Sequence, residues 1–115
     1  MYIDEKRDYI APVEQEQISP ERRLLYNAID MLENVGWCRG QDEMIVLGQT
    51  VGFCMSGAIQ LAQNFNREAN VGSVLAAVGR IIKSQGYTSI PIYNDGRGMH
   101  AAKAIGTMYE AAALL

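Results

Sequence analysis

The chain has 115 residues, of which 49% are hydrophobic and 20% are charged, a composition that fits one globular domain. Thirteen acidic residues against ten basic ones give a formal charge of -3. This balance removes the general attraction to phosphate backbones on which most nucleic-acid-binding domains depend. We therefore expect no nucleic-acid partner.

The chain has two cysteines, Cys38 and Cys54, and neither lies in a CxxC motif. This argues against a disulfide framework or a thiolate zinc site, so we expect no metal and no cofactor. The first residues lack a cationic start followed by an apolar run, and no window approaches the ~20 apolar residues of a membrane span. We expect a cytoplasmic protein that is neither exported nor inserted into a membrane.

Residues 1–18 mix charges with isolated apolar residues at no helical spacing, which predicts an N-terminal arm. Ser19 and Pro20 then predict a helix start, because serine is a good N-cap and proline fits the first helical position. The apolar positions of this helix form one stripe that ends before Gly36, namely Leu24, Leu25, Ala28, Ile29 and Leu32. Residues 19–115 are predicted to form one globular domain.

Two short extended runs, 37–40 and 44–48, predict a small β-hairpin with its turn at residues 39–43. Apolar spacing then predicts a helix over about 52–65 and another from Val71 to about Ile82. Three elements complete the chain: an edge strand over 88–93, a turn over 94–98 and a helix over 99–114. The fold class is α+β and predominantly α, with about four helices, a small hairpin and a short edge strand.

Three segments carry a resemblance to a known family: Gly36-Trp37, Phe53-Cys54-Met55-Ser56-Gly57-Ala58 and Tyr93-Asn94-Asp95-Gly96-Arg97-Gly98. In this order they resemble a family of small uncharacterised bacterial and phage proteins. The chain departs from the family pattern in having Tyr93 in place of a tryptophan and in lacking the proline before its second turn glycine. The resemblance implies the fold and the grouping of the three segments, and a phage or prophage origin, but it implies no activity.

Cys54 is predicted near a helix N-terminus, where backbone N–H groups lower a thiol pKa and can create a nucleophile. With His100 as base and Asn94 or Asp95 as orienting residue, it would form the catalytic set of a cysteine-dependent hydrolase or transferase. The alternative is a small buried residue among the apolar neighbours of Cys54, with His100 in solvent near a helix cap.

The turn at 94–98 offers an amide, a carboxylate and a guanidinium from Asn94, Asp95 and Arg97, a combination that can hold a phosphate or a carboxylate. Three further residues complete the predicted binding set: Trp37, Arg39 and Tyr93. The structural alternative is that the turn only caps the next helix, with its glycines at positive φ, and that Trp37 anchors the core.

These patterns favour a non-enzymatic interaction protein that binds a host protein or sequesters a small anionic ligand, in an anti-defence or regulatory role. The cysteine-dependent enzyme is the alternative. The small-residue face of Gly72, Ala76 and Gly79 fits close packing within the chain or across a homodimer or higher homo-oligomer equally well.

Overall fold

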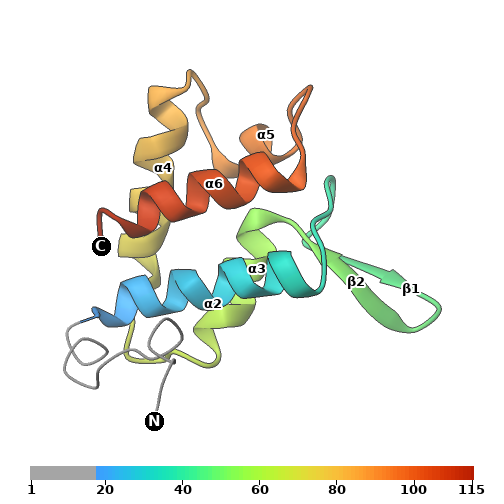
Figure 1. The fold of residues 1–115 in the computed structure, drawn as a ribbon, viewed down its shortest axis with the longest axis horizontal. Helices are drawn as coiled ribbons and strands as arrows, with labels where there is room; N and C mark the ends of the chain where they lie inside the picture. The colour runs from blue at the N-terminus through green and yellow to red at the C-terminus, as the bar shows by residue number, and fades with distance from the viewer. Residues whose placement is uncertain (1–17) are drawn as a thin grey trace, which may run out of the picture.

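The computed structural model describes residues 18–115, which form a mainly helical α+β domain with one β-hairpin (Figure 1). The N-terminal arm predicted over residues 1–18 lies, except for its last residue, outside the described residues. The elements in chain order are α2 (Pro20–Asn34), β1 (Glu43–Val46), β2 (Gln49–Phe53), α3 (Met55–Gln63), α4 (Val71–Ser84), α5 (Ile90–Asn94) and α6 (Ala101–Ala112).

The helix α2 begins and buries its apolar side chains as the sequence predicts. The Ser19 hydroxyl accepts a hydrogen bond from the Arg22 backbone N–H, and Pro20 occupies the first turn, where its missing N–H has no partner to lose. All five residues of the predicted apolar stripe are buried. The Ser19 hydroxyl also donates to the Leu115 carbonyl at 3.0 Å, and Arg22 Nε donates to the Ala112 carbonyl at 2.9 Å. The start of α2 is thus tied to the end of α6.

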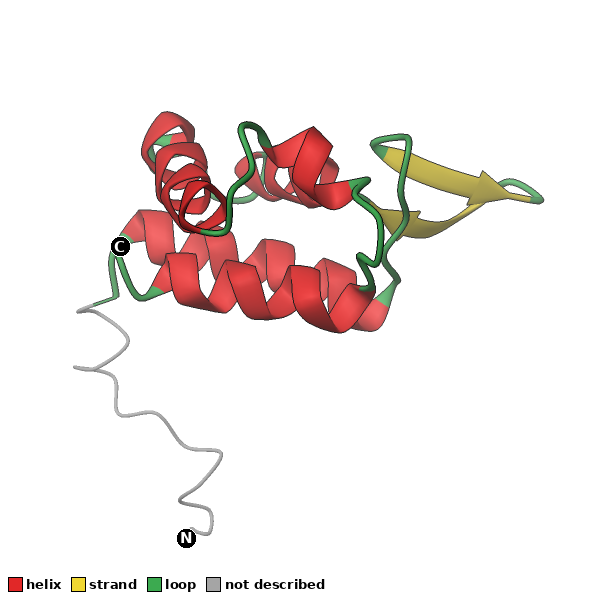
Figure 2. Cartoon of the chain, turned by 90° about the horizontal axis from the view of Figure 1, so that it is seen from above, coloured by secondary structure: helices red, strands yellow, loops and turns green. Residues whose placement is uncertain are grey.

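The core lies between the helices and includes Phe53, at the end of β2, but no other residue of the two strands. The helix α2 packs against α3 and α6, and α4 packs against α6, so that four helices enclose one apolar cluster. Seen from above, the helices form the body and the two strands extend away from it at one end (Figure 2). Within residues 18–115, no helix has the length and apolar content needed to cross a membrane.

A hairpin is present, but it lies further along the chain than predicted. The predicted strand over 37–40 is wrong, since only Trp37 forms an isolated bridge there, and the second predicted run pairs with residues 49–53 instead. The strands pair antiparallel with Val46 opposite Gln49, so Leu47 and Gly48 form the turn, and residues 39–43 lead into β1. Both turn residues have positive φ, 52° at Leu47 and 80° at Gly48, as a two-residue turn between twisted strands requires. The local sequence does not predict a turn at this position, because a leucine seldom adopts this conformation.

The predicted edge strand over 88–93 is wrong: the segment forms the short helix α5. The Ser89 hydroxyl caps it by accepting from the Ile92 N–H, and Pro91 lies in the first turn, where the helix needs no N–H donor. Tyr93 is fully buried, and its hydroxyl lies 3.0 Å from Gln85 Oε1 and 2.6 Å from Thr107 Oγ1. This tertiary anchoring decides the conformation of a segment whose alternating residues suggested a strand.

The predicted helices α3 and α6 are confirmed, but each starts a few residues later than expected. Cys54 and His100 are their N-cap residues, in extended conformation just outside the helices. His100 therefore lies just before the last helix, and neither Asn94 nor Asp95 caps that helix.

Gly57, in the first turn of α3, permits the closest backbone approach to the segment before β1. A Cβ atom at this position would lie 2.2 Å from the Asp42 carbonyl oxygen, well inside van der Waals contact. The Asp42 carbonyl also accepts from the Cys54 N–H at 3.2 Å. The absence of a side chain at Gly57 thus fixes where the Asp42 segment meets α3.

We predict that Gly57→Ala lowers the free energy of unfolding by about 1 to 3 kcal/mol, because the Asp42 backbone must move. The matched control is Gly106→Ala in α6, where a Cβ would meet nothing within 4 Å. That change should stabilise the protein by up to about 1 kcal/mol through helix propensity. Urea unfolding followed by circular dichroism measures both. Equal effects at the two positions would contradict the close approach.

Candidate functional site

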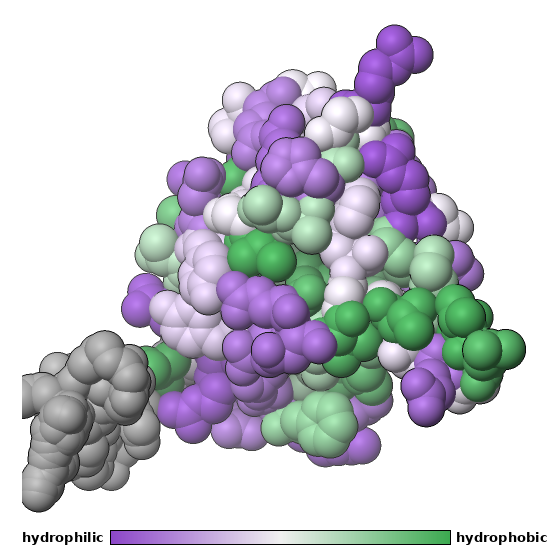
Figure 3. All heavy atoms as spheres, turned by 45° about the vertical axis from the view of Figure 1, so that its right-hand side comes forward, coloured by the Kyte–Doolittle hydropathy of each residue, from purple (hydrophilic) through white to green (hydrophobic). Residues whose placement is uncertain are grey.

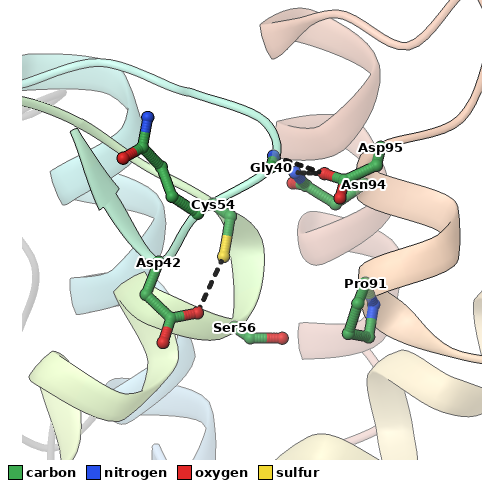
Figure 4. Close-up of a pocket in the computed structure, with 8 residues that line it drawn as sticks. Gly40, Asp42, Cys54, Ser56, Pro91, Asn94 and Asp95 are labelled. Atoms are coloured by element: carbon green, nitrogen blue, oxygen red, sulfur yellow. Dashed lines mark hydrogen bonds between the residues drawn. The ribbon is translucent and has the colours of Figure 1, made fainter.

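A small cavity lies where the loop before β1 meets the start of α3 and the helix α5. Its volume is about 150 Å³, and its lining residues are Gly40, Gln41, Asp42, Cys54, Ser56, Pro91, Asn94 and Asp95. Figure 4 shows the Cys54 thiol directed toward Asp42 on one wall, with Asn94 and Asp95 on the wall opposite. Three of the predicted site residues are thus brought together here.

Asn94 is buried and uses its side-chain amide to join three separate segments. Its Oδ1 accepts from Trp37 Nε1 at 2.7 Å and from the Met55 N–H at 3.1 Å. Its Nδ2 donates to the Cys38 carbonyl and to Asp95 Oδ1, both at 3.0 Å. With both amide groups engaged, Asn94 holds the start of α3 and the segment 37–38 to the end of α5.

Asp95 and Arg39 form a second connection between the same segments. Asp95 Oδ1 accepts from the Gly40 N–H at 2.9 Å, and the Arg39 guanidinium donates to the Asp95 and Met99 carbonyls. The hydrogen bonds from Asn94 and then Gly40 hold the pKa of the Asp95 carboxyl below its usual range. The Arg39 guanidinium carbon also lies 5.6 Å from the centre of the Trp37 ring.

The surroundings of Cys54 disfavour its thiolate. Burial raises the pKa of the Cys54 thiol, the hydrogen bond from the Gly57 N–H opposes this, and Asp42 raises the pKa further. The sulfur lies 3.5 Å from Asp42 Oδ1 and accepts from the Gly57 N–H at 3.3 Å. The group facing the thiol is therefore a carboxylate, whose charge opposes formation of a nucleophile.

His100 takes part in a local contact instead of lining the cavity. Its Nδ1 accepts from the Lys103 N–H at 3.4 Å, in the first turn of the helix that it caps, and the side chain is exposed. The structure thus brings Cys54, Asn94 and Asp95 to one cavity, whose lining does not include His100.

The other predicted binding residues occupy different surroundings. Tyr93 is a core residue that packs edge-on against Tyr87, with ring centres 4.9 Å apart. Trp37 is half-buried and donates to Asn94. Arg97 is exposed in the turn after α5, outside the lining of the cavity. Within the turn 94–98, Asn94 is buried and bonded to neighbouring segments, whereas Asp95 and Arg97 are exposed.

A comparison with known sequence families gives one match, to the "Family of unknown function (DUF6197)", over residues 18–114. The chain belongs to this family. The matched range covers nearly all of the described domain, including both walls of the cavity and the hairpin. Neither the curated proteins nor the solved structures returned a match.

In this family member an apolar surface lies on the hairpin, and it was not predicted from the sequence. Leu47 is 98% exposed and Ile45 60%, and Val46 and Val51 are also exposed. Figure 3 shows hydrophobic surface gathered on this projecting part of the molecule. The apolar run at 44–48 was visible in the sequence, but strands with such a run are usually buried in a sheet, so the run gave no sign of exposure.

The cavity can accept hydrogen bonds and favours a cation over an anion, since the ionisable carboxyls on its walls belong to Asp42 and Asp95. Among residues 18–115, no group of three or more histidine, cysteine or acidic side chains is placed to hold a metal ion. The polar groups found here serve mainly to connect the loop, α3 and α5.

We predict that Asn94→Ala lowers the free energy of unfolding by about 2 to 4 kcal/mol, because Trp37 Nε1 and the Met55 N–H lose a buried acceptor. The Trp37 fluorescence, the only tryptophan signal of the chain, should change with the loss of that hydrogen bond. The control is Asn64→Ala at an exposed position. A variant as stable as the parent would contradict the structural role of Asn94.

We predict that Cys54 reacts slowly with iodoacetamide at pH 7 in the folded protein, about tenfold or more slower than in the unfolded chain. Asp42→Asn should speed this reaction, because loss of the negative charge lowers the pKa of the thiol and increases the thiolate fraction. Asp30→Asn, at an exposed position on α2, is the control. Mass spectrometry separates labelling of Cys54 from that of Cys38. Rapid labelling at pH 7 would support the enzyme hypothesis instead.

Proposed function

We propose that the protein is a non-enzymatic protein-binding module and that its projecting hairpin is the contact surface. The observation that carries this proposal is Leu47, a large apolar side chain that is 98% exposed while its backbone has a positive φ of 52°. An apolar residue in this conformation costs about 1 to 2 kcal/mol and gains no burial within the domain. An asparagine would suit the turn better.

Other exposed apolar residues adjoin Leu47, so the exposed apolar area is larger than one side chain. Single exposed apolar residues are normal on proteins, whereas adjoining ones indicate interaction sites. Ile45, Val46 and Val51 lie on the two strands next to Leu47 and are 41% to 60% exposed. The hairpin has only two strands, and such a unit is marginally stable until something packs on it.

A protein partner suits this surface better than the small anion that the sequence also allowed. The guanidinium of Arg39 is engaged with backbone carbonyls, and Asp42 and Asp95 line the nearby cavity. The enzyme alternative is disfavoured by the raised pKa of the Cys54 thiol and by its carboxylate neighbour. What supports binding is the exposed apolar hairpin.

We predict that Leu47→Asn leaves the free energy of unfolding unchanged or raises it by up to about 1 kcal/mol, because asparagine tolerates positive φ and no buried contact is lost. Ile45→Ser, at the most exposed large apolar residue of the two strands, should cost less than about 1 kcal/mol. Thermal unfolding measures both. A large loss of stability at Leu47 would show that the side chain serves folding instead.

Binding itself is tested with a photo-cross-linking amino acid at position 47, with position 110 on α6 as the control site, in a lysate of the encoding organism. We expect one discrete adduct from position 47. Excess unlabelled parent protein should suppress it, and excess Leu47→Asn protein should not. Adducts that form equally from both positions, or that both competitors suppress equally, would refute the hairpin as the contact surface.

A further inference from the structure

The outer edge of β1 is open to pairing with a further strand. The opposite edge of the hairpin is occupied at its base, since the Phe53 N–H donates to the Gly36 carbonyl and the Phe53 carbonyl accepts from the Cys38 N–H. The backbone N–H and carbonyl of Phe53 therefore point away from β1. Phe53 and its partner Glu43 thus form a pair without mutual hydrogen bonds, and the backbone N–H and carbonyl of Glu43 point away from β2.

The register shows that the backbone N–H and carbonyl of Ile45 also point away from β2. A two-residue turn is closed by a hydrogen-bonded pair, here Val46 with Gln49, and the next pair, Ile45 with Thr50, is of the other kind. The N–H and carbonyl groups of Glu43 and Ile45 therefore point away from β2. Within residues 18–115, no backbone hydrogen bond involves this edge of β1.

Glu43 and Ile45 are two residues apart, so their side chains lie on one face of the hairpin, the face that also carries Phe53 opposite Glu43. This face meets a shallow hollow of about 390 Å³ between the hairpin base and α3. The lining residues of the hollow are Asp42, Glu43, Phe53, Gly57, Gln60, Leu61 and Asn64.

The hollow is apolar in part and acidic at one end. Phe53 and Leu61 supply hydrocarbon surface, and Asp42 and Glu43 supply two carboxylates. The lining contains no lysine or arginine, and the Glu43 carboxylate accepts only from the Thr50 hydroxyl among the described residues. A long basic side chain matches this arrangement, because its stem packs on apolar atoms while its charge reaches a carboxylate.

We propose that the partner of the hairpin is an extended, basic protein segment that pairs with β1 as a third strand. This proposal rests on the proposed function of the hairpin as a protein-binding surface. It adds the chemistry of the partner. A lysine or arginine opposite Glu43 enters the hollow, and an apolar residue two positions away packs against Ile45. The recognition pattern is therefore basic, any residue, apolar, or its reverse, since the strand can run in either direction.

Charge argues against a second copy of the same chain as occupant. The chain carries a net charge of -3, and the end of β1 beside the hollow presents Asp42 and Glu43. Pairing with a basic segment neutralises these carboxylates, whereas an acidic partner would place like charges together.

The test is selection from a phage-displayed library of random peptides about 12 residues long against the full chain. We expect enrichment of peptides with a lysine or arginine two positions from a valine, isoleucine, leucine or aromatic residue. An enriched peptide is then synthesised, and its affinity is measured by fluorescence polarisation at two salt concentrations, where binding should weaken as salt increases.

Two variants probe the two parts of the contact. Glu43→Gln keeps the acceptor for Thr50 and removes the charge, and should weaken peptide binding about fivefold to tenfold. Ile45→Pro removes the outward N–H without removing a hydrogen bond to β2, and should weaken binding about tenfold or more. Glu110→Gln, an exposed glutamate on α6, should have no effect. Circular dichroism confirms that each variant is folded.

The other outcomes separate this inference from the proposed function. Peptides that need Leu47 but lack a basic residue, or that bind the Glu43→Gln and Ile45→Pro variants normally, would overturn the strand-pairing inference and leave the hairpin as a binding surface. No enrichment, or binding that is insensitive to every hairpin variant, would overturn both. Self-association that Leu47→Asn abolishes, seen by sedimentation velocity, would replace the basic segment with a second copy.

Discussion

The buried amide of Asn94 is the interaction on which the arrangement of this domain depends. It satisfies the indole N–H of Trp37, the first N–H of α3 and the carbonyl of Cys38 from a single side chain. Each of these groups lies in a place where water does not replace the partner easily, so the loss of the amide would leave several polar groups unsatisfied at once. The positions of the hairpin base and of α3 relative to α5 follow from this one residue.

The same junction shows that residues which suggest a ligand or catalytic site in the sequence also make structural contacts. Asparagine, aspartate and arginine near a cysteine suggest a ligand site or a catalytic set, but the same groups can satisfy one another. Asn94, Asp95 and Arg39 each form hydrogen bonds to backbone groups of neighbouring segments. Cys54 is part of the same junction, where burial and Asp42 raise the pKa of its thiol.

The hairpin makes few contacts with the rest of the domain, unlike the junction around Asn94. The body of the domain encloses an apolar core, although Phe65 and Ile92 on its surface are exposed, and residues 18–115 contain no unpartnered buried side-chain N or O atom. The hairpin leaves four adjoining apolar residues exposed, namely Ile45, Val46, Leu47 and Val51, and holds Leu47 at positive φ. A feature that costs stability and gains no contact within the domain is the basis of the proposed contact surface.

The sequence by itself determined the elements that depend on local signals. Ser19 with Pro20 located α2, the apolar stripes located α2 and α4, and the fold class followed from these together with the two extended runs. Capping and apolar periodicity act over a few residues, so they can be read directly. Only the tertiary structure decided the rest. Residues 90–94 form a helix because Tyr93 is buried in the core. The hairpin turn lies at Leu47, which has an unfavourable φ. Asn94 bonds to Trp37 and Met55, which lie 57 and 39 residues away along the chain. These outcomes depend on contacts between distant segments, whose energy outweighs local preference and leaves no local pattern.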